Sequence, residues 1–165
     1  MINILLGIQS FVFIAYLAFI ISKFGILHSI SLSWYRLQEK NPKQGFLFTF
    51  FCWGLAIPMM MMSAYIDADT STLIMLSGGG LVFTGSAAAF KSKDAKTDLV
   101  HFIGAATAII SGLLGIGLIY NNFVPMVIVA LATILAYMNK LKNGIFWIEV
   151  IAFISIIVGL IISTN

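Results

Sequence analysis

The sequence predicts an all-α protein, a polytopic transmembrane helical bundle with six spans. The chain is 61% hydrophobic and 9% charged, with a mean hydropathy of +1.06, whereas soluble domains are about one quarter charged. All nine Lys and Arg residues fall into the segments 23–43, 91–96 and 140–142, and mostly apolar stretches separate these segments. The 165 residues have room for about six spans of roughly 20 residues each. We therefore predict a single transmembrane domain over residues 1–165 and no water-soluble domain.

The apolar stretches define the expected spans in chain order. The first stretch has no basic segment before it and no Ala-x-Ala cleavage site, so we interpret it as a retained span rather than a signal peptide. Pro125 stands at the start of the fifth stretch, where a missing N–H is tolerated. The predicted spans are about 2–22, 45–65, 72–90, 99–120, 124–138 and 145–162.

The distribution of charge predicts the orientation. Six spans place the three basic segments on one side of the membrane and both termini on the other, together with Asp67, Asp69, Asn121 and Asn122. The positive-inside rule makes the basic side cytoplasmic, which gives an N-out, C-out protein of the plasma membrane, such as the bacterial inner membrane. The same rule accounts for the net charge of +3, so we expect membrane lipids as partners and no nucleic acid.

The connection between the first two spans, residues 23–44, is too long for a tight turn. Its apolar residues recur at three- and four-residue spacing, with polar residues between them. This pattern favours an amphipathic helix at the cytoplasmic interface, with Trp34 and Tyr35 at headgroup level. The alternative is that the first span continues past the membrane. The apolar residues in question are Ile26, Leu27, Ile30, Trp34 and Leu37.

Small residues in the third and fourth spans predict close helix packing. One stripe of the fourth span consists of Gly104, Ala108 and Gly112. The third span contains three consecutive glycines, residues 78–80, and Gly85. In lipid the hydrophobic effect does not drive helices together, so they associate through close packing. Small residues allow this because they let two helix backbones approach one another. The two spans are therefore expected to form a central pair. The same stripes can instead join two copies of the chain in a homo-oligomer.

Polar residues near the cytoplasmic ends of the spans form the candidate site. Glu149 lies about one turn into the last span, where ionisable groups are costly. It is either a first-turn carboxylate favoured by the helix dipole or a buried partner or site residue. Asp98 and His101 stand three residues apart at the same depth and can meet on one helix face. With the first connection they give the candidate ligand-binding set for a lipid or other amphiphile: Ser29, Ser31, Tyr35, Asp98, His101 and Glu149.

Two other functions are weighed against amphiphile binding. His28, His101 and Glu149 have the donor types of a catalytic zinc site, which suggests a metal-assisted lipid hydrolase with Ser31 as a polar helper. The chain has neither His-x-x-x-His nor His-Glu-x-x-His spacing, and a hydrogen-bonded network explains the same residues without a metal. We therefore predict no cofactor and keep zinc as the alternative. A small transporter or channel is disfavoured because no ionisable group lies at mid-membrane.

Several segments resemble known proteins. Ser29-Ile30-Ser31-Leu32-Ser33-Trp34-Tyr35 resembles the Ser-Ile-Ser-x-x-Tyr-Tyr segment of small six-helix bacterial and phage membrane proteins of unknown function, and the stretches 48–53, 85–91 and 100–105 are similar too. That group is distantly reminiscent of the CREST superfamily, which includes alkaline ceramidases and progestin/adipoQ receptors. Its hydrolase-like members have seven spans and a zinc site with a His-x-x-x-His pair in the last one. This chain has Glu149 there instead, so the resemblance implies the architecture alone.

Overall fold

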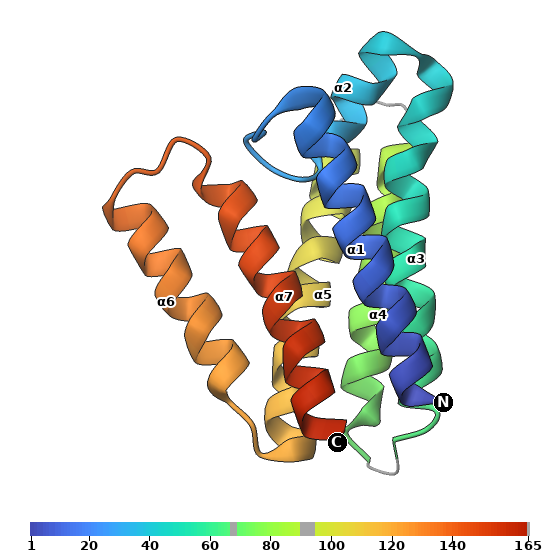
Figure 1. Ribbon diagram of the computed structural model, residues 1–165, viewed down its shortest axis with the longest axis vertical. Helices are drawn as coiled ribbons and strands as arrows, with labels where there is room; N and C mark the ends of the chain where they lie inside the picture. The colour runs from blue at the N-terminus through green and yellow to red at the C-terminus, as the bar shows by residue number, and fades with distance from the viewer. Residues whose placement is uncertain (67–68, 90–94, 165) are drawn as a thin grey trace.

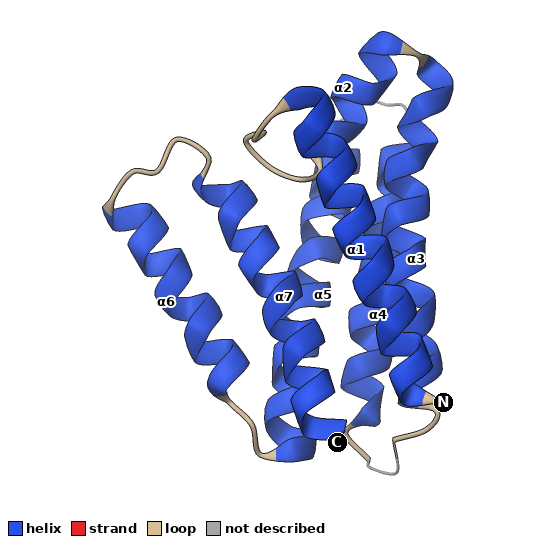
Figure 2. Cartoon of the chain, viewed as in Figure 1, coloured by secondary structure: helices blue, strands red, loops and turns tan. Residues whose placement is uncertain are grey.

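The computed structural model describes the backbone of residues 1–66, 69–89 and 95–164, and the side chains of these residues except 88–89 and 95–98. The described chain is all-α, as predicted, and contains seven α-helices and one 3-10 turn (Figures 1 and 2). The elements are α1 (Ile2–Phe24), α2 (Leu32–Lys40), η1 (Pro42–Gly45), α3 (Phe46–Ser63), α4 (Ser71–Ala89), α5 (Ala95–Tyr120), α6 (Val124–Met138) and α7 (Gly144–Thr164).

Among the described residues, four segments are long and apolar enough to cross a membrane, which identifies a multi-pass membrane protein. They are Ile2–Phe24, Pro42–Ser63, Leu99–Tyr120 and Gly144–Thr164. Within the described side chains, the apolar parts of α4 and α6 are shorter, namely Ser71–Ala87 and Val124–Met138. The 15 residues of α6 correspond to roughly 22 Å at 1.5 Å per residue, less than the hydrocarbon thickness of about 30 Å. Helix length therefore supports four of the six predicted spans.

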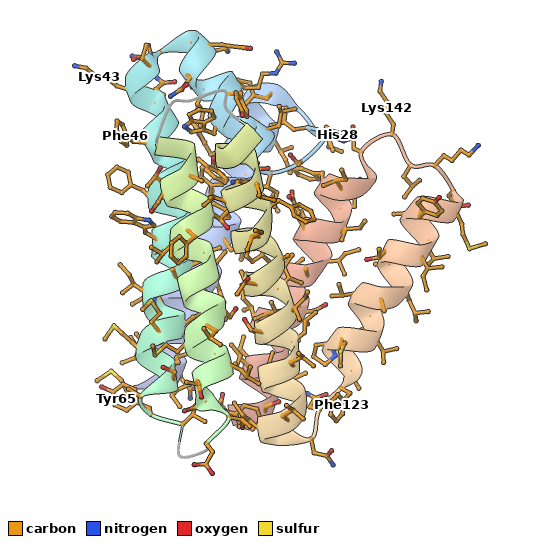
Figure 3. The ribbon with its side chains drawn as sticks, turned by 180° about the vertical axis from the view of Figure 1, so that it is seen from behind. His28, Lys43, Phe46, Tyr65, Phe123 and Lys142 are labelled. Atoms are coloured by element: carbon orange, nitrogen blue, oxygen red, sulfur yellow. The ribbon has the colours of Figure 1, made fainter. Side chains whose placement is uncertain are left out.

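The apolar helices run alternately up and down the bundle, and both termini lie at the same end (Figure 1). Lys43, His28 and Lys142 lie at the opposite end, whereas Tyr65 and Phe123 lie toward the termini (Figure 3). We call the end that carries segments 23–43 and 140–142 the basic end. The second predicted basic segment, 91–96, and Asp67 are outside the described side chains.

The connection after α1 folds into a bend followed by a short helix. Gly25 ends α1 with a φ of 72°, a left-handed conformation that glycine adopts without strain. The first span therefore does not continue into the connection. An amphipathic helix is present, but α2 has only 9 residues. The ring of Trp34 is buried beside Gly45, and the position of Trp34 and Tyr35 at headgroup level stays a prediction.

Close backbone contacts join α4 to α5 at the centre of the bundle. A Cβ built on Gly80 would lie 2.5 Å from the carbonyl oxygen of Gly104, and a Cβ on Gly104 would lie 2.8 Å from that of Gly80. The Ser77 hydroxyl donates a 2.6 Å hydrogen bond to the carbonyl of Ala108. On the other side of α4, Thr49 of α3 donates to the carbonyl of Gly85 at 3.0 Å. The small-residue stripes thus pack helices within one chain, and their use in a homo-oligomer stays a prediction.

Candidate functional site

Residues 25–31, which we call the strap, lie across the start of α7. The first N–H groups of a helix lack partners within the helix, and here the amide of Phe146 donates to the carbonyl of His28 at 3.0 Å. The side-chain amide of Asn143 donates to the carbonyl of Ile26 at 3.3 Å. The strap therefore caps α7 with its own backbone, more than a hundred residues away in the sequence.

Glu149 completes the attachment of the strap. Its Oε2 atom accepts a 2.6 Å hydrogen bond from the backbone amide of Ile30, a residue that is only 3% exposed. Glu149 itself is half-buried. An ionised carboxylate is costly to bury without a donor, and the strap amide supplies one. The carboxylate therefore has a partner inside the bundle rather than only water at the interface.

A small cavity of about 40 Å³ lies behind the strap. Four of its lining residues carry polar side-chain groups, namely Ser31, Thr84, His101 and Glu149. A water molecule needs roughly 10–15 Å³ measured in this way, so the cavity holds a few small polar atoms and no more. The apolar part of its wall includes Phe48, Phe51, Cys52, Leu81, Ile109 and Phe153. The structure thus combines residues of the strap, α3, α4, α5 and α7 around one space.

His101 is held against α4. Its Nδ1 atom lies 3.2 Å from the carbonyl oxygen of Thr84, and its ring centroid lies 6.1 Å from that of Phe48. Because a carbonyl oxygen only accepts hydrogen bonds, we assign the hydrogen to Nδ1. The Thr84 hydroxyl donates back to the carbonyl of Gly80 at 2.8 Å. Thr84 was not predicted as a site residue, and its one signal in the sequence is a hydroxyl four residues after Gly80 in a mostly apolar segment.

Of the other candidate ligand-binding residues, Ser29 and Tyr35 are not among the residues that line the cavity. Ser29 shares a 3.1 Å hydrogen bond with Ser31 and accepts one from the amide of Leu32 at 3.2 Å, so it helps to start α2. Tyr35 is 40% exposed and packs edge-on against the ring of Trp34. The side chain of Asp98 is outside the described residues.

The three candidate metal ligands are not all together. His101 and Glu149 line the cavity, whereas His28 is not among its lining residues and has an exposed side chain. Within the described part of the chain, no three His, Cys, Asp or Glu side chains are close enough to hold a metal ion. The donor set needed for zinc is therefore incomplete among these residues.

No protein-family profile, curated protein or solved structure matches this chain. The resemblance to small six-helix membrane proteins and to the CREST superfamily stays a prediction from the sequence. Any functional proposal must therefore rest on the geometry of the site itself.

Proposed function

We propose that this protein binds an amphiphile at its basic end and that the polar head of the ligand enters the cavity behind the strap. Support comes from one observation above all. Ser31, His101 and Glu149 belong to segments far apart in the sequence, and all three line the same cavity. In a chain with so few ionisable residues, two such groups beside one cavity are more than a helix bundle needs for packing.

The proposal includes six crossings, with the basic end cytoplasmic and both termini outside. The alternating direction of the apolar helices supports this topology (Figure 1). The lysines and the arginine described at one end meet the positive-inside rule. The short helix α6 carries exposed Val127, Leu131 and Ile134, and a helix with such a surface is suited to lipid rather than to water.

The lining residues favour a head group that donates hydrogen bonds. The carboxylate of Glu149 attracts an ammonium group or a hydroxyl and repels an anion. The rings of Phe48, Phe51 and Phe153 line the same space, and aromatic faces also attract cations. Because the cavity is only about 40 Å³, it accepts the tip of a head group while the alkyl chain stays at the protein–lipid boundary.

Long-chain probes of matched length test this proposal. We expect the full chain in maltoside detergent to bind dodecylamine and to reject dodecanoic acid, measured by isothermal titration calorimetry. Glu149→Gln should weaken amine binding roughly tenfold, the effect of about 1.4 kcal/mol of lost charge interaction. Glu39→Gln is the matched control, because Glu39 lies at the same end but is exposed and pairs with Arg36 at 3.3 Å. That control should bind the amine as the wild type does.

Two results would contradict the proposal. One is equal binding of the amine and the acid, and the other is an equal loss in the Glu149 and Glu39 variants. Because Glu149 also holds the strap, Ser31→Ala provides a second variant that leaves this bond in place. We expect it to weaken amine binding a few-fold with an unchanged melting temperature.

A further inference from the structure

Two lysine side chains converge on one aromatic ring at the basic end. The Nζ atom of Lys23 lies 5.7 Å from the ring centroid of Phe24, and that of Lys40 lies 5.2 Å from the same centroid. Lys23 also lies 5.1 Å from the ring centroid of Phe19. Lys23 is in the last turn of α1 and Lys40 is the last residue of α2. The fold thus brings together two like charges that are separated by 17 positions in the sequence.

No carboxylate within the described residues neutralises this pair. At this end Glu39 forms an ion pair with Arg36, and Glu149 accepts the amide of Ile30 beside the cavity. The polar partner of Lys23 is the neutral side-chain oxygen of Gln44, at 2.9 Å. Cation–π contacts orient ammonium groups but leave their charge in place. Two positive charges held in this way form a site for an anion.

The depth of the pair indicates which anion. The 23 residues of α1 extend roughly 34 Å at 1.5 Å per residue. The hydrocarbon core is about 30 Å thick, and with the headgroup layers the bilayer measures about 40–45 Å. The last turn of a membrane-spanning α1 therefore lies at headgroup level, where lysine side chains extend toward the phosphates.

We propose that Lys23 and Lys40 together bind the phosphate of an anionic phospholipid, with Phe24 as the platform that holds both ammonium groups. Lysine acts as a point charge toward phosphate oxygens, and basic residues beside a membrane recognise anionic headgroups. This site differs from the cavity behind the strap. None of its residues lines that cavity, and it selects a negative head group where the cavity favours a positive or neutral one.

The test compares two double variants with the same change in charge. In Lys23→Gln/Lys40→Gln the converging pair is lost, whereas Lys140→Gln/Lys142→Gln removes two lysines from another connection of the basic end. Phosphatidylglycerol binding to the full chain in detergent is measured by native mass spectrometry, with phosphatidylcholine as the competitor. We expect the first variant to lose roughly thirtyfold in affinity, as the removal of two lysine contacts at a membrane surface implies. The second should change less than twofold.

Equal losses in the two double variants would overturn the site in favour of diffuse surface charge, and so would displacement of the lipid by phosphatidylcholine. If inorganic phosphate alone binds as tightly as the lipid, the assignment to a phospholipid is wrong. Should the first double variant fold poorly, Lys40→Gln alone decides, because this exposed residue ends its helix. That variant should still weaken phosphatidylglycerol binding, and unchanged binding would contradict the proposal.

Discussion

At the level of single residues, a buried hydrogen bond between two hydroxyl groups joins α1 to α2. The hydroxyls of Tyr16 and Ser33 share a 2.7 Å hydrogen bond, and both side chains are buried. The ring of Tyr16 also stacks on that of Phe51, with 4.2 Å between centroids. The bond holds α2 against the bundle, so it fixes the far end of the strap that covers the cavity.

Removal of both members of this pair should cost less than the sum of the two single removals. Tyr16→Phe leaves the Ser33 hydroxyl buried without its partner, which costs about 1–3 kcal/mol of stability. We expect Ser33→Ala to cost a similar amount, and the double variant to cost clearly less than the sum of the two. Thermal unfolding in detergent, followed by circular dichroism, measures all three. Additive effects would mean that the hydroxyls act independently.

Gln9 is a buried polar residue that carries no charge. It is buried in α1, where its side-chain amide donates to the carbonyl of Leu55 at 3.4 Å. Its Oε1 atom has no hydrogen-bond partner among the described residues. Neutral polar side chains also join helices in a membrane, so a glutamine in an apolar span was a usable signal. Glu149 was predicted from the sequence, but its partner is a backbone amide of the strap, which no sequence pattern reveals.

At the level of the helices, two neighbouring glycines of α4 have opposite surroundings. A Cβ on Gly79 would meet nothing within 4 Å, whereas a Cβ on Gly80 would lie 2.5 Å from the carbonyl oxygen of Gly104 and 2.6 Å from the amide nitrogen of Ala108. Both of these atoms belong to the backbone of α5, so no side-chain rotation can relieve the contact. The sequence predicted that α4 and α5 pair, but not which of three consecutive glycines makes the contact.

The pair therefore provides a matched test of the α4–α5 contact. Gly80→Ala should destabilise the protein by about 1–3 kcal/mol, because the added methyl group forces the helices apart. Gly79→Ala should be neutral or stabilising by up to about 1 kcal/mol, because alanine favours helix. Thermal unfolding in detergent distinguishes them. Similar melting temperatures for the two variants would show that α4 and α5 are not in backbone contact.

The ends of the helices differ in how far the sequence predicts them. Charged or polar residues limit the long apolar helices, so α1 and α7 begin and end within a few residues of the predicted spans. The start of α2 depends instead on the left-handed Gly25 and on hydrogen bonds between the strap and α7. Such contacts are tertiary, and the amphipathic pattern alone therefore predicted a helix without its true bounds.

At the level of the whole molecule, α6 is the shortest of the helices predicted to cross the membrane. It lies at the edge of the bundle, beside α7 (Figure 1). Gly159 of α7 packs closely on Pro125, so that a Cβ there would lie 2.8 Å from the proline ring, and Gly144 lies next to Ala136. The helix is thus attached to α7 near both of its ends. If α7 spans the membrane, this attachment requires α6 to lie within the bilayer along the same length.

The topology can be tested with single cysteines, because Cys52 is the sole cysteine of the chain and is buried. In a Cys52→Ser background, we expect Asn122→Cys to react with a membrane-impermeant maleimide in intact cells. Lys43→Cys and Lys142→Cys should react only after the membrane is opened, if the basic end faces the cytoplasm as we propose. If α6 did not cross, Asn122→Cys and Lys142→Cys would label under the same condition. Labelling of both lysine positions in intact cells, with Asn122→Cys protected, would instead reverse the orientation and move the cavity and the lysine pair to the outer face.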